Sequence, residues 1–147
     1  MPKYLNIRAI LVGLIVSWAV SLSGECVSVT VLATHTGLGS KVNGHYETSS
    51  QLLHLAESIP LRLIGIAILG VGSIIGGATT GWLVSDHRLK NAMALALVHI
   101  AMSAPFIPFM KNYPIWLALI SMVAILTFTV LGGWISQFIF RNSDKSE

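Results

Sequence analysis

The sequence has little charge and almost no cysteine. Only 10% of its 147 residues are charged, whereas a soluble domain carries about 25%. The net charge of +3 is spread along the chain and forms no basic patch of the kind that binds nucleic acid. The single cysteine, Cys26, excludes an intrachain disulfide, and no Cys/His spacing indicates a metal site. We therefore expect no metal and no nucleic-acid partner.

Motifs of enzymes are missing as well. The chain has no nucleophile elbow, and its glycine-rich stretch GVGSIIGGATTGW, residues 70–82, lacks the lysine that follows a phosphate-binding loop. No catalytic constellation is visible elsewhere in the sequence. We therefore expect a protein that is not an enzyme and has no cofactor.

Long apolar runs dominate what is present. The chain is 54% hydrophobic, and a bilayer core of about 30 Å requires roughly 20 apolar residues of helix. Four segments qualify, at about residues 7–33, 61–84, 89–109 and 113–140. The sequence therefore predicts an all-α polytopic membrane protein, a bundle of four transmembrane helices forming a single domain over residues 1–140. Residues 34–60 would form an outer loop, and residues 141–147 a disordered cytoplasmic tail.

Basic residues predict the orientation of these spans. One side carries six of them, Lys3, Arg8, Arg88, Lys90, Arg141 and Lys145, and the other side carries three, Lys41, Arg62 and Lys111. Because the more basic side normally faces the cytoplasm, both termini are predicted to be cytoplasmic. The expected location is the plasma (inner) membrane, with the chain as a multi-pass protein.

The outer loop contains a signal for a short helix. Thr48 and Gln51 have the spacing of a capping box, in which two side chains satisfy each other's free amides. Apolar residues then recur at helical spacing ahead of Pro60. We expect a helix over residues 49–58 that lies on the outer membrane interface, with an irregular loop as the alternative.

The first apolar segment begins like a signal peptide. The fragment LSGEC also resembles a lipoprotein cleavage box, which requires a small residue immediately before the cysteine. Glu25 occupies that position, and the apolar run continues beyond the usual length of a signal-peptide core. We therefore expect the segment to be retained as a helix.

Small and polar residues recur at spacings that place them on shared helix faces. The first helix has Gly13, Ser17, Ser21 and Glu25, the second has one track of Gly72, Gly76 and Thr80 and another of Ser73, Gly77 and Gly81, and the fourth has Gly132 and Gly133. Small residues let helix backbones approach closely in membranes. These faces are expected at the centre of the bundle. The second helix would hold two neighbouring helices, or one neighbour and another subunit.

The candidate intramembrane ionisable residues are Glu25, His99 and Arg62. Such groups are candidates for function because lipid cannot satisfy them. Three roles are open to Glu25: carrying protons or cations, pairing with His99 or Arg62, or hydrogen-bonding a serine while protonated. His99 could equally form a structural hydrogen bond to a neighbouring helix.

Two resemblances concern the architecture. A glutamate in the first of four spans is similar to small multidrug resistance transporters, but this chain is longer, its first outer loop is larger and the remaining pattern does not align. The stretch GGATTGWLVSDHRLKNAMALAL resembles the middle of small four-span bacterial membrane proteins of unknown function, with a GG-x-x-x-G second helix. That resemblance covers about residues 64–103 and implies a fold without an activity.

These patterns favour a small integral membrane protein that is non-enzymatic and acts as a structural, assembly or accessory subunit of a membrane complex. Its partners would be the lipid bilayer and either a second copy of itself or other membrane subunits. The alternative is a proton- or cation-coupled small-molecule transporter that uses Glu25 and His99.

Overall fold

The computed structural model describes residues 5–35, 59–84, 86–105 and 114–141. Four α-helices account for most of these ranges: α1 (Ile7–His35), α3 (Ile59–Trp82), α4 (Arg88–Ser103) and α5 (Ile115–Arg141). The predicted all-α class is confirmed. The short helix expected over residues 49–58, its capping box and the tail after Arg141 lie outside the described residues.

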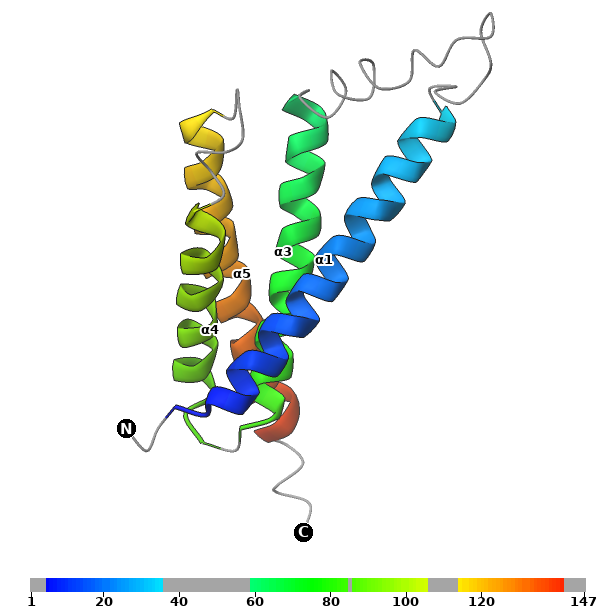
Figure 1. Ribbon diagram of the computed structural model, residues 1–147. Coiled ribbons are helices and arrows are strands. Elements are labelled where there is room, and N and C mark those ends of the chain that lie inside the picture. The colour runs from blue at the N-terminus through cyan, green and yellow to red at the C-terminus, as the bar shows by residue number, and fades with distance from the viewer. Residues whose placement is uncertain (1–4, 36–58, 85, 106–113, 142–147) are drawn as a thin grey trace, which may run out of the picture.

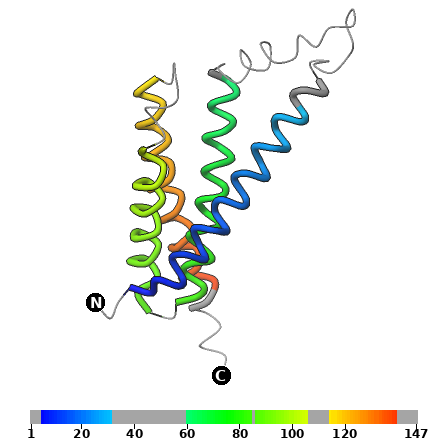
Figure 2. The backbone as a smooth tube through the Cα atoms, in the orientation of Figure 1, coloured from blue at the N-terminus to red at the C-terminus, as the bar shows by residue number. Residues whose placement is uncertain are grey.

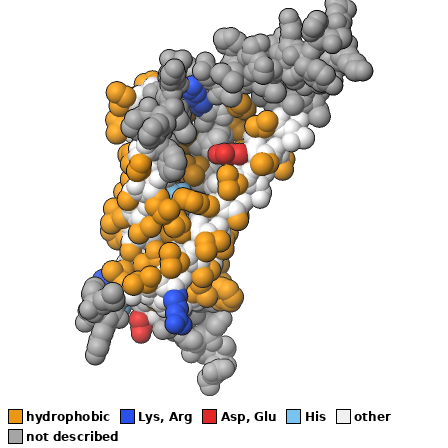
Figure 3. All heavy atoms as spheres, viewed as in Figure 1, with side chains coloured by type: hydrophobic (Ala, Val, Ile, Leu, Met, Phe, Trp, Pro, Cys, Tyr) orange, Lys and Arg blue, Asp and Glu red, His pale blue; other side chains and the backbone are white. Residues whose placement is uncertain are grey.

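Three of the helices are long and apolar enough to cross a membrane. The qualifying segments are Ile7–Val31, Pro60–Trp82 and Ile115–Ile139. With 1.5 Å of rise per residue, α1, α3 and α5 extend about 44, 36 and 40 Å, more than the bilayer core requires. Large apolar side chains cover much of the outside (Figure 3), and Ile15, Val123 and Ile139 are each more than half exposed. Length and surface together indicate a membrane protein.

Helix α4 is shorter than the sequence predicts. It has 16 residues, which corresponds to about 24 Å, and a 3₁₀ turn follows at residues 104–105. The early end has a physical reason, because Pro105 has no N–H to continue the helical hydrogen bonds and restricts the residue before it. The remainder of the span expected to reach residue 109 lies outside the described part of the chain.

The four helices run alternately up and down (Figure 1). Helix α3 is in the middle and packs against α1 on one side and α5 on the other, while α4 lies against α5, α3 and the first half of α1. The start of α1 and the end of α5 lie at the same end (Figure 1), which we call the terminal end. We call the opposite end, where α1 finishes and α5 begins, the loop end.

Helix α1 leans away from the bundle. It lies close to α3 and α4 near the terminal end and diverges from α4 and α5 toward the loop end (Figures 1 and 2). A buried cluster of Ile10, Leu14 and Leu95 fills the terminal half, where α1 meets α4. The bundle is therefore closed at the terminal end and opens toward the loop end.

Candidate functional site

The interface between α1 and α3 is built from the first small-residue track of α3. A Cβ atom added to Gly76 would lie 2.7 Å from both the carbonyl oxygen of Gly13 and the Cβ of Ser17. One added to Gly72 would lie 2.8 Å from the carbonyl oxygen of Ser17. Thr80 Oγ1 lies 3.0 Å from the Gly76 carbonyl and 3.3 Å from that of Ala9. The two backbones therefore approach more closely than larger residues permit.

The second track of α3 faces α5. A Cβ on Gly77 would run into the carbonyl of Thr129, and one on Gly81 would run into the side chain of Ser136. From the other side, Gly132 faces the backbone of Ile74, while the neighbouring Gly133 faces Ala92 of α4. Of the two arrangements that the sequence leaves open for α3, the structure has two neighbouring helices of the same chain.

Polar contacts fasten the terminal end. The backbone N–H of Asn6 donates to Asn91 Oδ1 over 2.8 Å, and Asn91 Nδ2 donates to the His87 carbonyl over 3.1 Å. Arg88 Nη1 donates to the Ser136 carbonyl on α5 over 3.2 Å. Sequence reasoning missed Asn91 as a contact residue. The available signal was an amide at the beginning of an apolar helix, where it is costly unless it is hydrogen-bonded.

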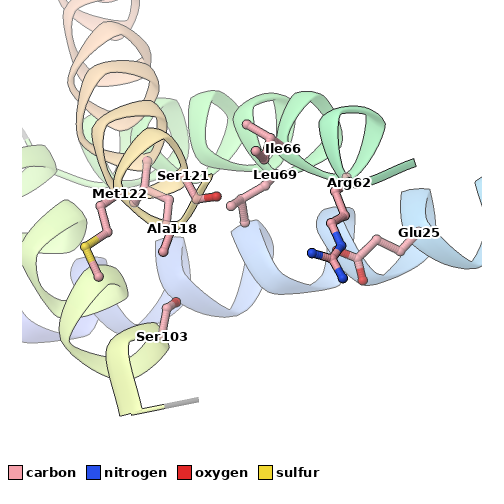
Figure 4. A pocket seen from close by; sticks show the side chains of 10 residues that line it. Glu25, Arg62, Ile66, Leu69, Ser103, Ala118, Ser121 and Met122 are labelled. Atoms are coloured by element: carbon pink, nitrogen blue, oxygen red, sulfur yellow. The ribbon is translucent and has the colours of Figure 1, made fainter. Parts of the chain in front are cut away.

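A pocket of about 280 Å³ lies on the side where α1 leans away (Figure 4). All four described helices contribute to what we call the α1 groove. Its lining residues are Glu25, Arg62, Gly65, Ile66, Leu69, Ser103, Ala118, Ser121, Met122 and Ile125. Two ionisable side chains thus share a groove that is otherwise lined by apolar residues and two serines.

The groove brings together two of the three predicted ionisable residues. The side chains of Glu25 on α1 and Arg62 on α3 point toward one another (Figure 4). His99 does not line the groove; it is buried on α4, with its ring centroid 6.3 Å from that of Trp18. Of the partners considered for Glu25, the geometry therefore favours Arg62 over His99.

A set of buried polar groups lies at mid-bundle, and we call it the polar layer. It consists of Ser17, Ser21, Ser73, His99 and Thr129, which are each at most 6% exposed. Within the described ranges, their side-chain oxygens and His99 Nδ1 have no hydrogen-bond partner. Other hydroxyls form a hydrogen bond within their own helix, to the carbonyl four residues earlier. These are the hydroxyls of Ser23, Thr30, Thr79 and Ser121. The polar layer is thus an exception within this bundle.

The polar layer is next to the α1 groove. On each of the four helices, a layer residue lies one helical turn from a groove residue, which places both on the same face. These pairs are Ser21 with Glu25, Ser73 with Leu69, His99 with Ser103, and Thr129 with Ile125. Unsatisfied polar atoms in a native protein require an explanation such as bound water or a ligand. The polar layer therefore lies one helical turn beyond the lining of the groove, toward the middle of the bundle.

Neither a search for metal-ligand clusters nor comparison with known proteins indicates a function. In the portion of the chain that the structure describes, no three His, Cys, Asp or Glu side chains are placed to hold a metal ion. Comparisons with protein-family models, curated proteins and solved structures find no match. Inferences about function therefore start from the groove, the polar layer and the glycine interfaces.

Proposed function

We propose that this chain is a four-span, non-enzymatic integral membrane protein that works as an accessory component by holding another membrane component in the α1 groove. The number of spans follows from helix direction. Contacts advance together along α3 and α5, from Gly70 with Phe128 to Gly81 with Ser136, so the two helices run in parallel. If both cross the membrane in the same direction, the segment joining them must cross back, although α4 is only 16 residues long.

The direction of the chain also supports its proposed orientation. With four crossings, both termini lie on one side, as do the start of α1 and the end of α5 in Figure 1. The described basic residues at this end include Arg8, Arg88 and Lys90. Because basic residues are retained on the cytoplasmic side, we place the termini in the cytoplasm and the loop end outside, with the plasma membrane as the location.

The accessory role is supported by one observation, the opening of the bundle toward the loop end. The leaning of α1 leaves a groove with Glu25 and Arg62 beside an apolar floor, while glycine packing and polar contacts close the terminal end. A groove on the side of a bundle can receive a component that diffuses within the membrane. Among the described lining residues, the polar side chains provide binding groups but no nucleophile paired with a base, which favours binding over catalysis.

Purification in mild detergent followed by mass measurement tests this proposal. The groove can be filled by Gly65→Leu, because a Cβ at Gly65 meets no atom within 4 Å and the added side chain enters open space. Gly65→Ala is the matched control. We expect the wild type and Gly65→Ala to retain a second copy, another subunit or a lipid, and Gly65→Leu to lose it. A wild type that purifies as a bare monomer would refute the accessory role.

A second candidate function, proton- or cation-coupled transport, is favoured by the polar layer. Within the described ranges, the layer groups without a hydrogen-bond partner include Ser21, which lies one helical turn from Glu25 toward the terminal end, and His99. In reconstituted vesicles, transport predicts that Glu25→Gln and His99→Asn abolish flux driven by a pH gradient. The control Thr79→Val removes a hydroxyl that already donates to its own helix and should leave flux unchanged. Normal flux in Glu25→Gln would exclude this candidate.

A further inference from the structure

The two ionisable residues of the α1 groove, Arg62 and Glu25, lie near the loop-end limits of the apolar segments. Arg62 lies two residues inside the apolar segment Pro60–Trp82, and Glu25 lies six residues before the end of Ile7–Val31. These positions are roughly 3 and 9 Å of helix rise from the segment ends. Their side chains point toward one another (Figure 4), so the groove presents a guanidinium and a carboxyl group together near the loop-end limits of the two apolar segments.

The floor of the groove is apolar and continues toward mid-bundle. On α3, Gly65, Ile66 and Leu69 follow Arg62, and Met122 and Ile125 contribute from α5. The distance from Arg62 to Leu69 along the helix axis is about 10 Å. Gly65 leaves open space, since a Cβ there would have no neighbour within 4 Å. An occupant therefore needs a polar end with both charges and an apolar body that extends deeper into the membrane.

We propose that the α1 groove binds an aminophospholipid from the leaflet at the loop end, with its phosphate on Arg62 and its ammonium on Glu25. A guanidinium matches the geometry of a phosphate and can form two parallel hydrogen bonds to it. A carboxylate accepts hydrogen bonds from a primary ammonium. This inference rests on the proposed function and names the component that the groove holds.

The same chemistry disfavours other phospholipids. A lipid that carries only a phosphate would place a second anion beside Glu25, and Arg62 would be the one cation shared by both in the described lining of the groove. A choline lipid has its positive charge on a trimethylated nitrogen, which has no hydrogen to donate to Glu25. The α1 groove therefore selects a lipid with both a phosphate and a primary amine. Arg62 selects the phosphate and Glu25 selects the amine.

Native mass spectrometry of the full chain from bilayers of defined composition tests the lipid assignment. Equal mixtures of phosphatidylethanolamine, phosphatidylglycerol and phosphatidylcholine provide the three head groups. We expect the wild type to retain phosphatidylethanolamine about tenfold more than either competitor, as one lost charge-assisted hydrogen bond predicts. Glu25→Gln should retain phosphatidylethanolamine and phosphatidylcholine equally, and Arg62→Gln should weaken the binding of all three. Equal retention of the three lipids by the wild type would overturn the proposal.

Variants at Gly65 connect the selectivity to the groove. Gly65→Leu should lose phosphatidylethanolamine and Gly65→Ala should keep it, with circular dichroism showing that both variants retain their helices. If Gly65→Leu keeps the lipid, the lipid is bound elsewhere and the inference fails. If Gly65→Leu instead loses a protein subunit or a second copy while the wild type shows no lipid selectivity, the groove has an accessory role with a protein occupant. That result would reject only the lipid.

Discussion

The backbone N–H of Asn6 donates a 2.8 Å hydrogen bond to the side-chain oxygen of Asn91, 85 residues later in the chain. This bond joins the residue before α1 to the first turn of α4. The Asn91 side chain is fully buried, and its nitrogen is also satisfied, by the His87 carbonyl. A single amide side chain therefore links the start of α1 to α4 at the terminal end.

Replacing this amide should destabilise the bundle. Asn91→Ala removes the acceptor of the Asn6 N–H and the donor to His87, and we expect it to lower the free energy of unfolding by about 1 to 3 kcal/mol. The measurement is an SDS titration of the purified protein followed by circular dichroism. Met93→Ala on the same helix is the control, because Met93 is 47% exposed on the apolar surface. Equal stabilities of the two variants would contradict the structural role of Asn91.

Two glycines on the same helix should respond oppositely to a methyl group. At Gly76 the new Cβ would lie 2.7 Å from the Gly13 carbonyl, so α1 and α3 must separate. We expect Gly76→Ala to cost about 1 to 3 kcal/mol of stability, as overpacking does elsewhere. Gly65→Ala meets no such neighbour and should gain up to about 1 kcal/mol, because alanine favours helix more than glycine does. The same SDS titration compares the two variants with the wild type. A Gly76→Ala variant as stable as the wild type would refute the close approach of α1 and α3.

Replacing two threonines by valine, which has nearly the same shape, should change the free energy of unfolding in opposite directions. Thr129 has a buried hydroxyl oxygen without a partner among the described residues, so Thr129→Val should stabilise the protein by about 1 kcal/mol. Thr80 reaches the carbonyls of Ala9 and Gly76, and Thr80→Val should destabilise it by about 1 kcal/mol. If Thr129→Val is destabilising instead, water or a ligand occupies the polar layer.

The four-span topology predicts labelling from opposite sides. In a Cys26→Ser background, single cysteines at Asp86 and Lys111 flank the segment that contains α4. A membrane-impermeant maleimide should reach Asp86→Cys only from the cytoplasm and Lys111→Cys only from outside. Labelling of both positions from one side would exclude the return crossing. Labelling of Asp86→Cys only from outside and Lys111→Cys only from the cytoplasm would reverse the proposed orientation but keep the number of spans.

Hydropathy was sufficient to show which segments contain a helix, although it did not give the end of α4 at Ser103. All four apolar segments correspond to helices, and the predicted start of the first, at residue 7, agrees with α1. The glycine spacing also identified the residues that lie between α3 and its neighbours, because a spacing of four residues is a property of a single helix. Features within one helix could therefore be predicted from the order of its residues.

Relations between helices could not be predicted in the same way. Helix tilt is set by packing against neighbours, and the sequence contains no local sign that α1 diverges from α4 and α5. The sequence therefore left both His99 and Arg62 open as partners of Glu25, whereas the structure places Arg62 in the same groove. The absence of a described hydrogen-bond partner for the Thr129 hydroxyl was equally hidden, since it depends on the helices packed against α5.

The packing of α1 on α3 has a consequence for biosynthesis. Helix α1 precedes α3 in the chain and emerges from the ribosome first, so Ser17 and Ser21 at first have no glycine surface to cover them. A lone helix tolerates these hydroxyls because they can donate to carbonyls of their own backbone. When α3 arrives, its two tracks accept α1 and α5 on separate faces, so neither docking step obstructs the other. The bond from Asn6 to Asn91 can form only after α4 has been made, and it would then secure an assembly whose first pair is already in place.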